Sequence, residues 1–239
     1  MPVSLGARGQ GGGRRGGGKI GVTRFLDAAR HWEAEVVREA LQRSPELAAA
    51  VDRAGRSALH LCASARAAQT KRPVSASVTT ARALVTGGVP IDAVHEIPDG
   101  GERFPASALW FAIARGGNRP LARALLRLGA RPDFCLWAVV WDDDVTTAKL
   151  LLDHGADLDL SFRGETPLIY ATRLRRTRML RWLLHHGADA NIPDAQGRTA
   201  LWYALTRRYD AREVEELKRF GAVAGDAHLL RRRAVVMGA

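Results

Sequence analysis

The sequence is poor in the residues that build disulfide frameworks, zinc sites and membrane spans. Its 239 residues include two cysteines, Cys62 and Cys135, which lie far apart and lack the paired spacing of a zinc site. We therefore expect both thiols to be reduced and buried. No apolar run approaches the ~18 residues needed to cross a bilayer, and no hydrophobic segment follows the first basic residues. We expect a soluble cytoplasmic protein without a membrane, metal or cofactor role.

The motifs that mark common catalytic sites are missing as well. No glycine-rich loop is followed by Lys and Ser or Thr, no G-x-S-x-G segment is present, and no Cys and His have a diagnostic spacing. The run Asp142 to Asp144 is typical of a polar turn that caps the following helix. We therefore expect no catalytic residues and a protein that is not an enzyme. An enzyme hidden in the two long inserts described below would need a nucleophile or base that the sequence does not show.

Acidic residues are scarce at both ends of the chain. The net charge is +11, but residues 1–24 hold five Lys or Arg and residues 229–239 hold three Arg, with no acid in either segment. Subtracting these eight charges leaves about +3 for residues 25–228, so the body of the chain is only mildly basic. The overall charge therefore overstates the case for a nucleic-acid-binding surface.

The N-terminal segment is low in complexity. Residues 6–18 read GARGQGGGRRGGG, a composition that cannot bury enough apolar area to offset the entropy of ordering. We expect residues 1–22 to form a disordered Gly/Arg-rich leader. The alternative is a short RNA-binding arm that contacts phosphates without sequence preference, but this segment lacks the aromatic residues that stack on bases.

A repeat organises the remainder of the chain. Gly164 stands two residues before Thr166-Pro167-Leu168, and thirty-three residues later Gly197 stands before Thr199-Ala200-Leu201. A fixed period of this size indicates stacked supersecondary units. Thr166 can cap the first amides of a helix and Pro167 fits its first turn. Leu180, Leu183 and Leu184 then have the spacing of a second amphipathic helix, which ends at His185-His186-Gly187.

These segments resemble the ankyrin repeat. The matching strings are GETPLIYA at 164–171 and WLLHHGADAN at 182–191, with Ile169 in place of the family's usual His. The resemblance implies an all-α fold, a solenoid of stacked helix-turn-helix units in which each pair covers the apolar face of its neighbour. The weaker copies begin at Ser57, where the family's His is retained as His60, and at Ser107.

The resemblance implies an ankyrin-repeat domain over residues 23–228, with about six units. The units are interrupted by insertions near 64–79 and 93–106. Pro73 and the many Ser and Thr residues favour a loop in the first insertion, and the second is expected to be a long hairpin. Residues 229–239 are expected to form a basic C-terminal tail.

The resemblance also implies a function in protein-protein recognition, as a scaffold, adaptor or inhibitor that acts as a monomer. Ankyrin-like proteins use hairpin tips and the exposed face of the first helices, which line a concave groove. Arginine and aromatic residues on such a surface are typical anchors of an interface. The partner-binding residues expected from this register are Phe162, Arg163, Glu165, Arg173, Leu174, Arg175, Arg176, Gln196, Arg198, Arg207, Arg115 and Trp141.

The chemistry of the partner is suggested by one cluster. Arg173, Arg175, Arg176, Arg178 and Arg181 span the turn between two helices, and no acid lies near them in the sequence. Our hypothesis is a protein partner with an acidic surface. The alternatives are a nucleic-acid-associated protein that uses the Arg-rich ends, and a bacterial effector that acts on a foreign partner. The hypothesis of a bacterial effector is based on the high Arg and Ala content, which is typical of GC-rich genomes.

Overall fold

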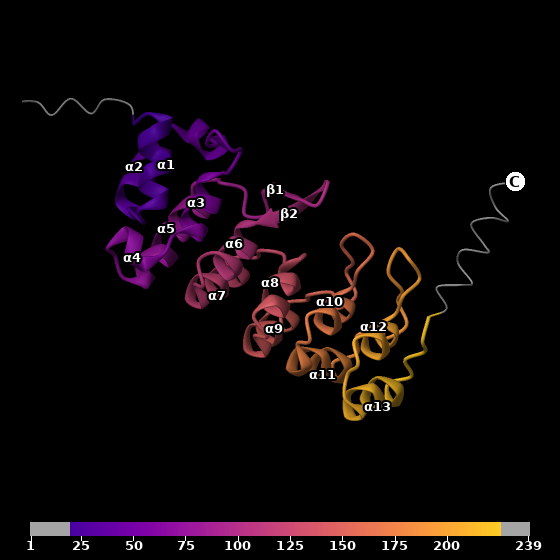
Figure 1. Ribbon diagram of the computed structural model, residues 1–239. Coiled ribbons are helices and arrows are strands. Elements are labelled where there is room, and N and C mark those ends of the chain that lie inside the picture. Colours follow the sequence, from indigo (N-terminus) through magenta and orange to yellow (C-terminus); the bar gives the residue numbers. More distant parts are fainter. Residues whose placement is uncertain (1–19, 226–239) are drawn as a thin grey trace, which may run out of the picture.

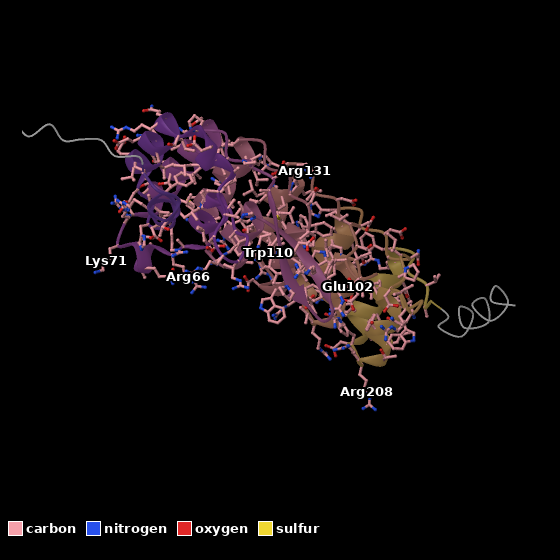
Figure 2. All side chains as sticks on the ribbon, turned by 90° about the horizontal axis from the view of Figure 1, so that it is seen from above. Arg66, Lys71, Glu102, Trp110, Arg131 and Arg208 are labelled. Carbon is pink, nitrogen blue, oxygen red and sulfur yellow. The ribbon has the colours of Figure 1, made fainter. Side chains whose placement is uncertain are left out.

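A computed structural model of the chain describes residues 20–225. The expected leader up to residue 19 and the expected basic tail lie outside the described residues. Within 20–225 the chain is a row of paired helices stacked side by side (Figure 1). Arg66 and Lys71 lie toward the N-terminal end of the row, and Arg208 lies at the other end (Figure 2).

The helices form two layers. The first helices of the pairs are α1 (Val22–Arg30), α3 (Ala58–Ser64), α6 (Ala108–Ala114), α8 (Cys135–Trp141), α10 (Pro167–Arg173) and α12 (Ala200–Thr206). The second helices are α2 (Ala34–Arg43), α5 (Val74–Thr86), α7 (Arg119–Arg127), α9 (Val145–Leu152), α11 (Thr177–His185) and α13 (Ala211–Arg219). Two short helices, η1 (Pro45–Ala49) and α4 (Ala67–Thr70), complete the set. Each first helix packs on the next, and α2 packs on α5, which packs on α7. The expected solenoid of helix pairs is confirmed.

Four first helices begin at a hydroxyl cap. The side chains of Ser57, Ser107, Thr166 and Thr199 each accept a hydrogen bond from the backbone N–H three residues later. This bond satisfies one of the amides that a helix start leaves without an internal partner. The positions expected from the repeat are therefore the positions at which the helices start.

The core runs through the whole length of the stack. The residues predicted to face inward in the clearest repeat are buried, with Leu168, Leu180, Leu183 and Leu184 all exposing 1% or less. Cys62 and Cys135 are free and fully buried, as predicted. Each helix stripe is covered by the neighbouring pair, so burial depends on the stack and not on any single unit.

The loop expected at 64–79 is wrong, because this segment is largely helical. It forms α4 and then the first part of α5, which begins directly after Pro73. Proline fits this position because its fixed φ and missing N–H cost nothing at a helix start. The hydroxyl groups of Ser77 and Thr79 donate to the carbonyls of Val74 and Ser75, so these polar residues are tolerated inside the helix.

The second insertion is a β-hairpin that projects beside the stack (Figure 1). Strands β1 (Val94–Asp99) and β2 (Glu102–Ser107) pair antiparallel, from Val94 opposite Ser107 to Asp99 opposite Glu102. The two-residue turn is Gly100-Gly101, and both glycines have positive φ, as a tight hairpin with the strand twist requires. Within residues 20–225 this two-stranded sheet interrupts the series of helices, and β2 leads directly into α6.

Candidate functional site

A groove of about 770 Å³ opens between the β1–β2 hairpin and the first helices of three consecutive pairs. The hairpin contributes Ile97 to Asp99 and Phe104, and the turn before α12 contributes Gln196. The helices α6, α8 and α10 supply residues from their exposed faces and C-terminal turns. Three repeats and the insertion therefore build one surface that no single unit possesses.

Aromatic side chains dominate the apolar part of the groove. The Phe104 ring lies 5.3 Å from that of Trp110 and 5.1 Å from that of Phe162, centroid to centroid. The Trp137 and Tyr170 rings, on neighbouring helices, are 4.7 Å apart. These distances are typical of edge-to-face and tilted aromatic contacts. The Trp137 ring also lies 6.1 Å from that of Phe162, so the rings contact one another across five chain segments. Trp110 lies near the middle of the stack (Figure 2).

Trp141 differs from the other aromatic residues of the groove. It is 55% exposed at the last residue of α8, whereas Trp110 and Trp137 are half-buried. No aromatic contact fixes its ring among residues 20–225. Trp141 therefore leaves a large apolar surface open at the edge of the groove.

The charges of the groove largely balance. Arg163 on the turn before α10 pairs with Asp99 of the hairpin at 3.4 Å, and Arg173 pairs with Glu165 at 3.0 Å. Burial raises the pKa of Glu165, and the nearby Arg173 guanidinium acts against that rise. The groove also contains Arg115 and Asp142, so three arginines face three acids.

Several polar atoms at the groove have no partner among the described side chains. The indole nitrogens of Trp110 and Trp137 and the Nε atom of Arg173 are buried without a hydrogen-bond acceptor. An N–H group left in this state costs free energy, which an acceptor close by would recover. The groove therefore holds donors that the fold itself leaves unpaired.

Seven of the residues expected from the repeat register line this groove. They are Arg115, Trp141, Phe162, Arg163, Glu165, Arg173 and Gln196. The other expected residues, Leu174, Arg175, Arg176, Arg198 and Arg207, do not line it.

Three of those outside the groove take part in contacts within the stack. Arg198 pairs with buried Asp194 at 2.7 Å. The guanidinium group of Arg175 lies over the Tyr209 ring at 4.8 Å and donates to the Arg207 carbonyl. Arg207 in turn donates to the carbonyl of Arg173.

Four aromatic residues of the groove were missed by sequence reasoning. Trp110 follows the Ser107 cap by three residues and Tyr170 follows the Thr166 cap by four, so their offsets from the helix start could have placed them on the exposed face. Trp137 follows Phe134, which stands directly before α8 with a positive φ and offers no capping side chain. Phe104 belongs to the insertion, where the repeat provides no offset.

The arginine cluster around the α10–α11 turn is partly neutralised by acids from other segments. Arg181 pairs with Glu213 of α13 at 2.8 Å, in addition to the pair between Arg173 and Glu165. Arg176 and Arg178 pair with no acid among residues 20–225. The pair with Glu213 could not be predicted from the local sequence, because Glu213 lies thirty-two residues beyond Arg181.

The described residues contain no arrangement of catalytic groups that we can recognise. Burial raises the pKa of both cysteine thiols far above its usual value, which removes the reactive thiolate. Asp144 accepts a hydrogen bond from the Thr147 N–H and caps α9, as expected for the Asp142 to Asp144 run. Within residues 20–225, no three His, Cys, Asp or Glu side chains gather in a way that could hold a metal ion.

Comparison with known proteins agrees with the stack of helix pairs. A family model described as ankyrin repeats in three copies matches residues 109–194 and 135–217. The chain is an ankyrin repeat protein. Ankyrin repeats are generally modules for protein-protein interaction. Every helix within residues 20–225 is too short or too polar to span a bilayer.

Other ankyrin repeat proteins resemble this chain in sequence and in structure. A mouse protein named for ankyrin repeat, SAM and basic leucine zipper domains is 39% identical over 72 residues, which is 30% of this chain and 15% of that protein. The ankyrin repeat domain of Bcl-3 is 25% identical with a TM-score of 0.63, over 85% of this chain and 89% of that domain. An ankyrin repeat domain from Acinetobacter baumannii has the same TM-score of 0.63 and 24% identity, over 83% of this chain and 98% of that chain, and shows the shared fold. This chain spans about a fifth or less of the length of the curated relatives it matches.

Proposed function

We propose that this ankyrin repeat protein binds another protein, and that a segment of the partner lies in the aromatic groove beneath the β1–β2 hairpin. The observation that carries the proposal is the gathering of six aromatic side chains in one groove. They are Phe104, Trp110, Trp137, Trp141, Phe162 and Tyr170. Tyr and Trp are the residue types that most often dominate binding energy, because they bury a large area at little entropic cost.

The partner segment must match the mixed chemistry of the groove. Because three arginines face three acids, a strongly acidic segment gains no net attraction there. A segment with one or two large apolar side chains, flanked by charges of both signs, complements the rings and the ion pairs.

An acidic part of the same partner lies, in this proposal, against the arginines beside the groove. Arg175, Arg176 and Arg178 follow Arg173 at the end of α10, and none of the three pairs with an acid among residues 20–225. Carboxylates of the partner would contact these arginines, which speeds the encounter more than it strengthens the complex. The predicted acidic surface of the partner thus contacts the edge of the groove.

Replacing Trp141 with Ala should weaken partner binding about 30-fold, which corresponds to about 2 kcal/mol for an anchor residue. Trp141 is 55% exposed, so the substitution leaves the core intact and the thermal midpoint nearly unchanged. The partner is first captured by affinity purification with the wild-type chain, and its affinity is then measured by surface plasmon resonance.

The matched control is Val22→Ala, since Val22 is also a large exposed apolar residue, 48% exposed at the start of α1. This change should leave the affinity within twofold of wild type. Equal affinities of the Trp141→Ala and wild-type chains would show that the partner binds elsewhere and would refute the proposed site.

A further inference from the structure

A row of arginines lies on the opposite layer of the stack, on the second helices. Arg119, Arg123 and Arg127 recur at every fourth residue of α7, and Arg82 of α5 lies with them along one groove of about 660 Å³. All four side chains are exposed. Residues four apart on a helix lie on one face and are about 6 Å apart along its axis. The arginines of α7 therefore form a row of positive charge along one face of the helix.

The fold supplies almost no counter-charge to this row. Neither α5 nor α7 contains an Asp or Glu. Arg119 pairs with Asp144 at 2.9 Å, but Arg82, Arg123 and Arg127 pair with no acid among residues 20–225. This differs from the aromatic groove, where arginines face an equal number of acids.

The floor between the arginines is apolar. The groove is completed by Val78 of α5 and by Pro120, Ala124 and Leu128 of the α7 segment. Val78, Ala124 and Leu128 are half-buried, so part of their surface remains open to a ligand. An apolar strip bordered by a line of arginines has the complementary pattern of a helix with an apolar stripe bordered by acids.

We infer that the groove between α5 and α7 binds an acidic amphipathic helix of a partner protein. Carboxylates spaced four residues apart on such a helix match the spacing of Arg119, Arg123 and Arg127. Its small apolar residues would lie on Val78, Ala124 and Leu128. Helix-in-groove recognition of this kind uses an apolar stripe for affinity and flanking charges for register.

Two other polyanions fit this surface less well. Single-stranded nucleic acid needs aromatic platforms for base stacking, and none of the residues that line the groove is aromatic. A membrane surface needs large apolar side chains that insert, and none of the lining residues is among the exposed large apolar residues within 20–225. An acidic amphipathic helix complements both the row of arginines and the aliphatic side chains between them.

The inference is tested by selecting a displayed library of helical peptides on the full chain. Enriched peptides should carry an apolar stripe with acidic residues at four-residue spacing. Their affinity, measured by fluorescence anisotropy, should fall at least tenfold for the variant Arg123→Glu/Arg127→Glu. The matched variant Arg53→Glu/Arg212→Glu changes the net charge equally at two exposed arginines of other units, and it should stay within twofold of wild type. Circular dichroism confirms that both variants remain folded.

Three results would overturn the inference. One is a selection that enriches no peptide, or only neutral or basic peptides. Another is an enriched peptide that binds the Arg123→Glu/Arg127→Glu variant as tightly as wild type. The third is tighter binding of oligothymidine or of phosphatidylserine vesicles, lost in the same variant. A peptide that depends on Trp141 and not on Arg123 and Arg127 would lie in the aromatic groove, which separates this test from that of the proposed function.

Discussion

Lowering the pH from 7 to 4 should reduce the free energy of unfolding by about 3 kcal/mol through His60 alone. His60 is 1% exposed, and burial lowers its pKa from 6.5 to about 4. The charge of His95, whose ring centroid lies 6.1 Å away, acts in the same direction. Between pH 6.5 and 4 the unfolded chain therefore takes up a proton that the folded protein does not bind. The stability is present above pH 6.5 and is lost as the pH falls toward 4.

The hydrogen bonds of His60 determine which ring nitrogen carries the hydrogen in the folded protein. Its Nδ1 atom accepts from the Ser57 N–H at 3.2 Å, so Nε2 carries the hydrogen and donates to the Ala106 carbonyl at 3.2 Å. A proton on Nδ1 would face the Ser57 N–H group and break the capping box. The ring thus ties the start of α3 to the strand that leads into α6.

The measurement is urea unfolding of the wild type and of His60→Gln at pH 7.0, 5.5 and 4.5. Glutamine keeps the acceptor of the capping box and does not titrate. The variant should lose less stability than the wild type over this range, since the other histidines are common to both. Parallel loss of stability in the two proteins would show that His60 is not the group responsible.

Replacing Asp194 with Ala should lower the free energy of unfolding by about 3 kcal/mol, since the change removes a buried carboxylate that accepts several hydrogen bonds. The Asp194 side chain is 1% exposed and accepts from the N–H groups of Gln196 and Arg198, the Arg198 Nε at 2.7 Å and the Tyr203 hydroxyl at 2.8 Å. Burial alone would raise the pKa of Asp194, but the hydrogen bonds from Arg198 and Tyr203 outweigh it and the pKa is lowered. The contribution of Asp194 is therefore complete at neutral pH and is lost only below about pH 3.8.

The matched control for this change is Asp189→Ala in the same region of the stack. Asp189 is exposed, and its carboxylate accepts one backbone hydrogen bond, from Asn191 at 2.8 Å. Removing the Asp189 carboxylate should lower the free energy of unfolding by less than 1 kcal/mol, roughly the contribution of one exposed hydrogen bond. Both values come from denaturant unfolding at pH 7. An Asp194→Ala chain that is no less stable than the Asp189→Ala chain would contradict the assigned network.

The helix pairs could be predicted from the sequence because each repeat specifies a capping residue at the helix start and the spacing of the apolar residues that follow. Ser57 and Thr166 cap helices where the pattern places them, and the leucines of α11 are buried. The first part of α5, from Val74 to Thr79, was missed because Ser and Thr have low helix propensity. The hydrogen bonds from their hydroxyl groups to the Val74 and Ser75 carbonyls form only once the helix is present.

The aromatic groove could be predicted only in part. Phe162, Arg163 and Glu165 follow from the repeat register, since the turn before α10 projects them at a known place. Phe104 could not be placed, because the path of the β1–β2 hairpin depends on contacts with the rings of Phe134 and Phe162, which lie far along the chain. Arg173 was expected to contact a partner, and its pair with Glu165 shows that part of the arginine cluster is neutralised within its own unit.

The central claim is that the partner lies in the aromatic groove, and site-specific photocrosslinking tests it most directly. A photoreactive amino acid is placed in separate chains at position 141 in the groove, at position 22 on α1 and at position 123 on the α7 arginine row, and each chain is illuminated with the captured partner. We predict a crosslink from position 141 that is absent from position 22. A partner that crosslinks from position 22 or 123 and not from position 141 would contradict the account.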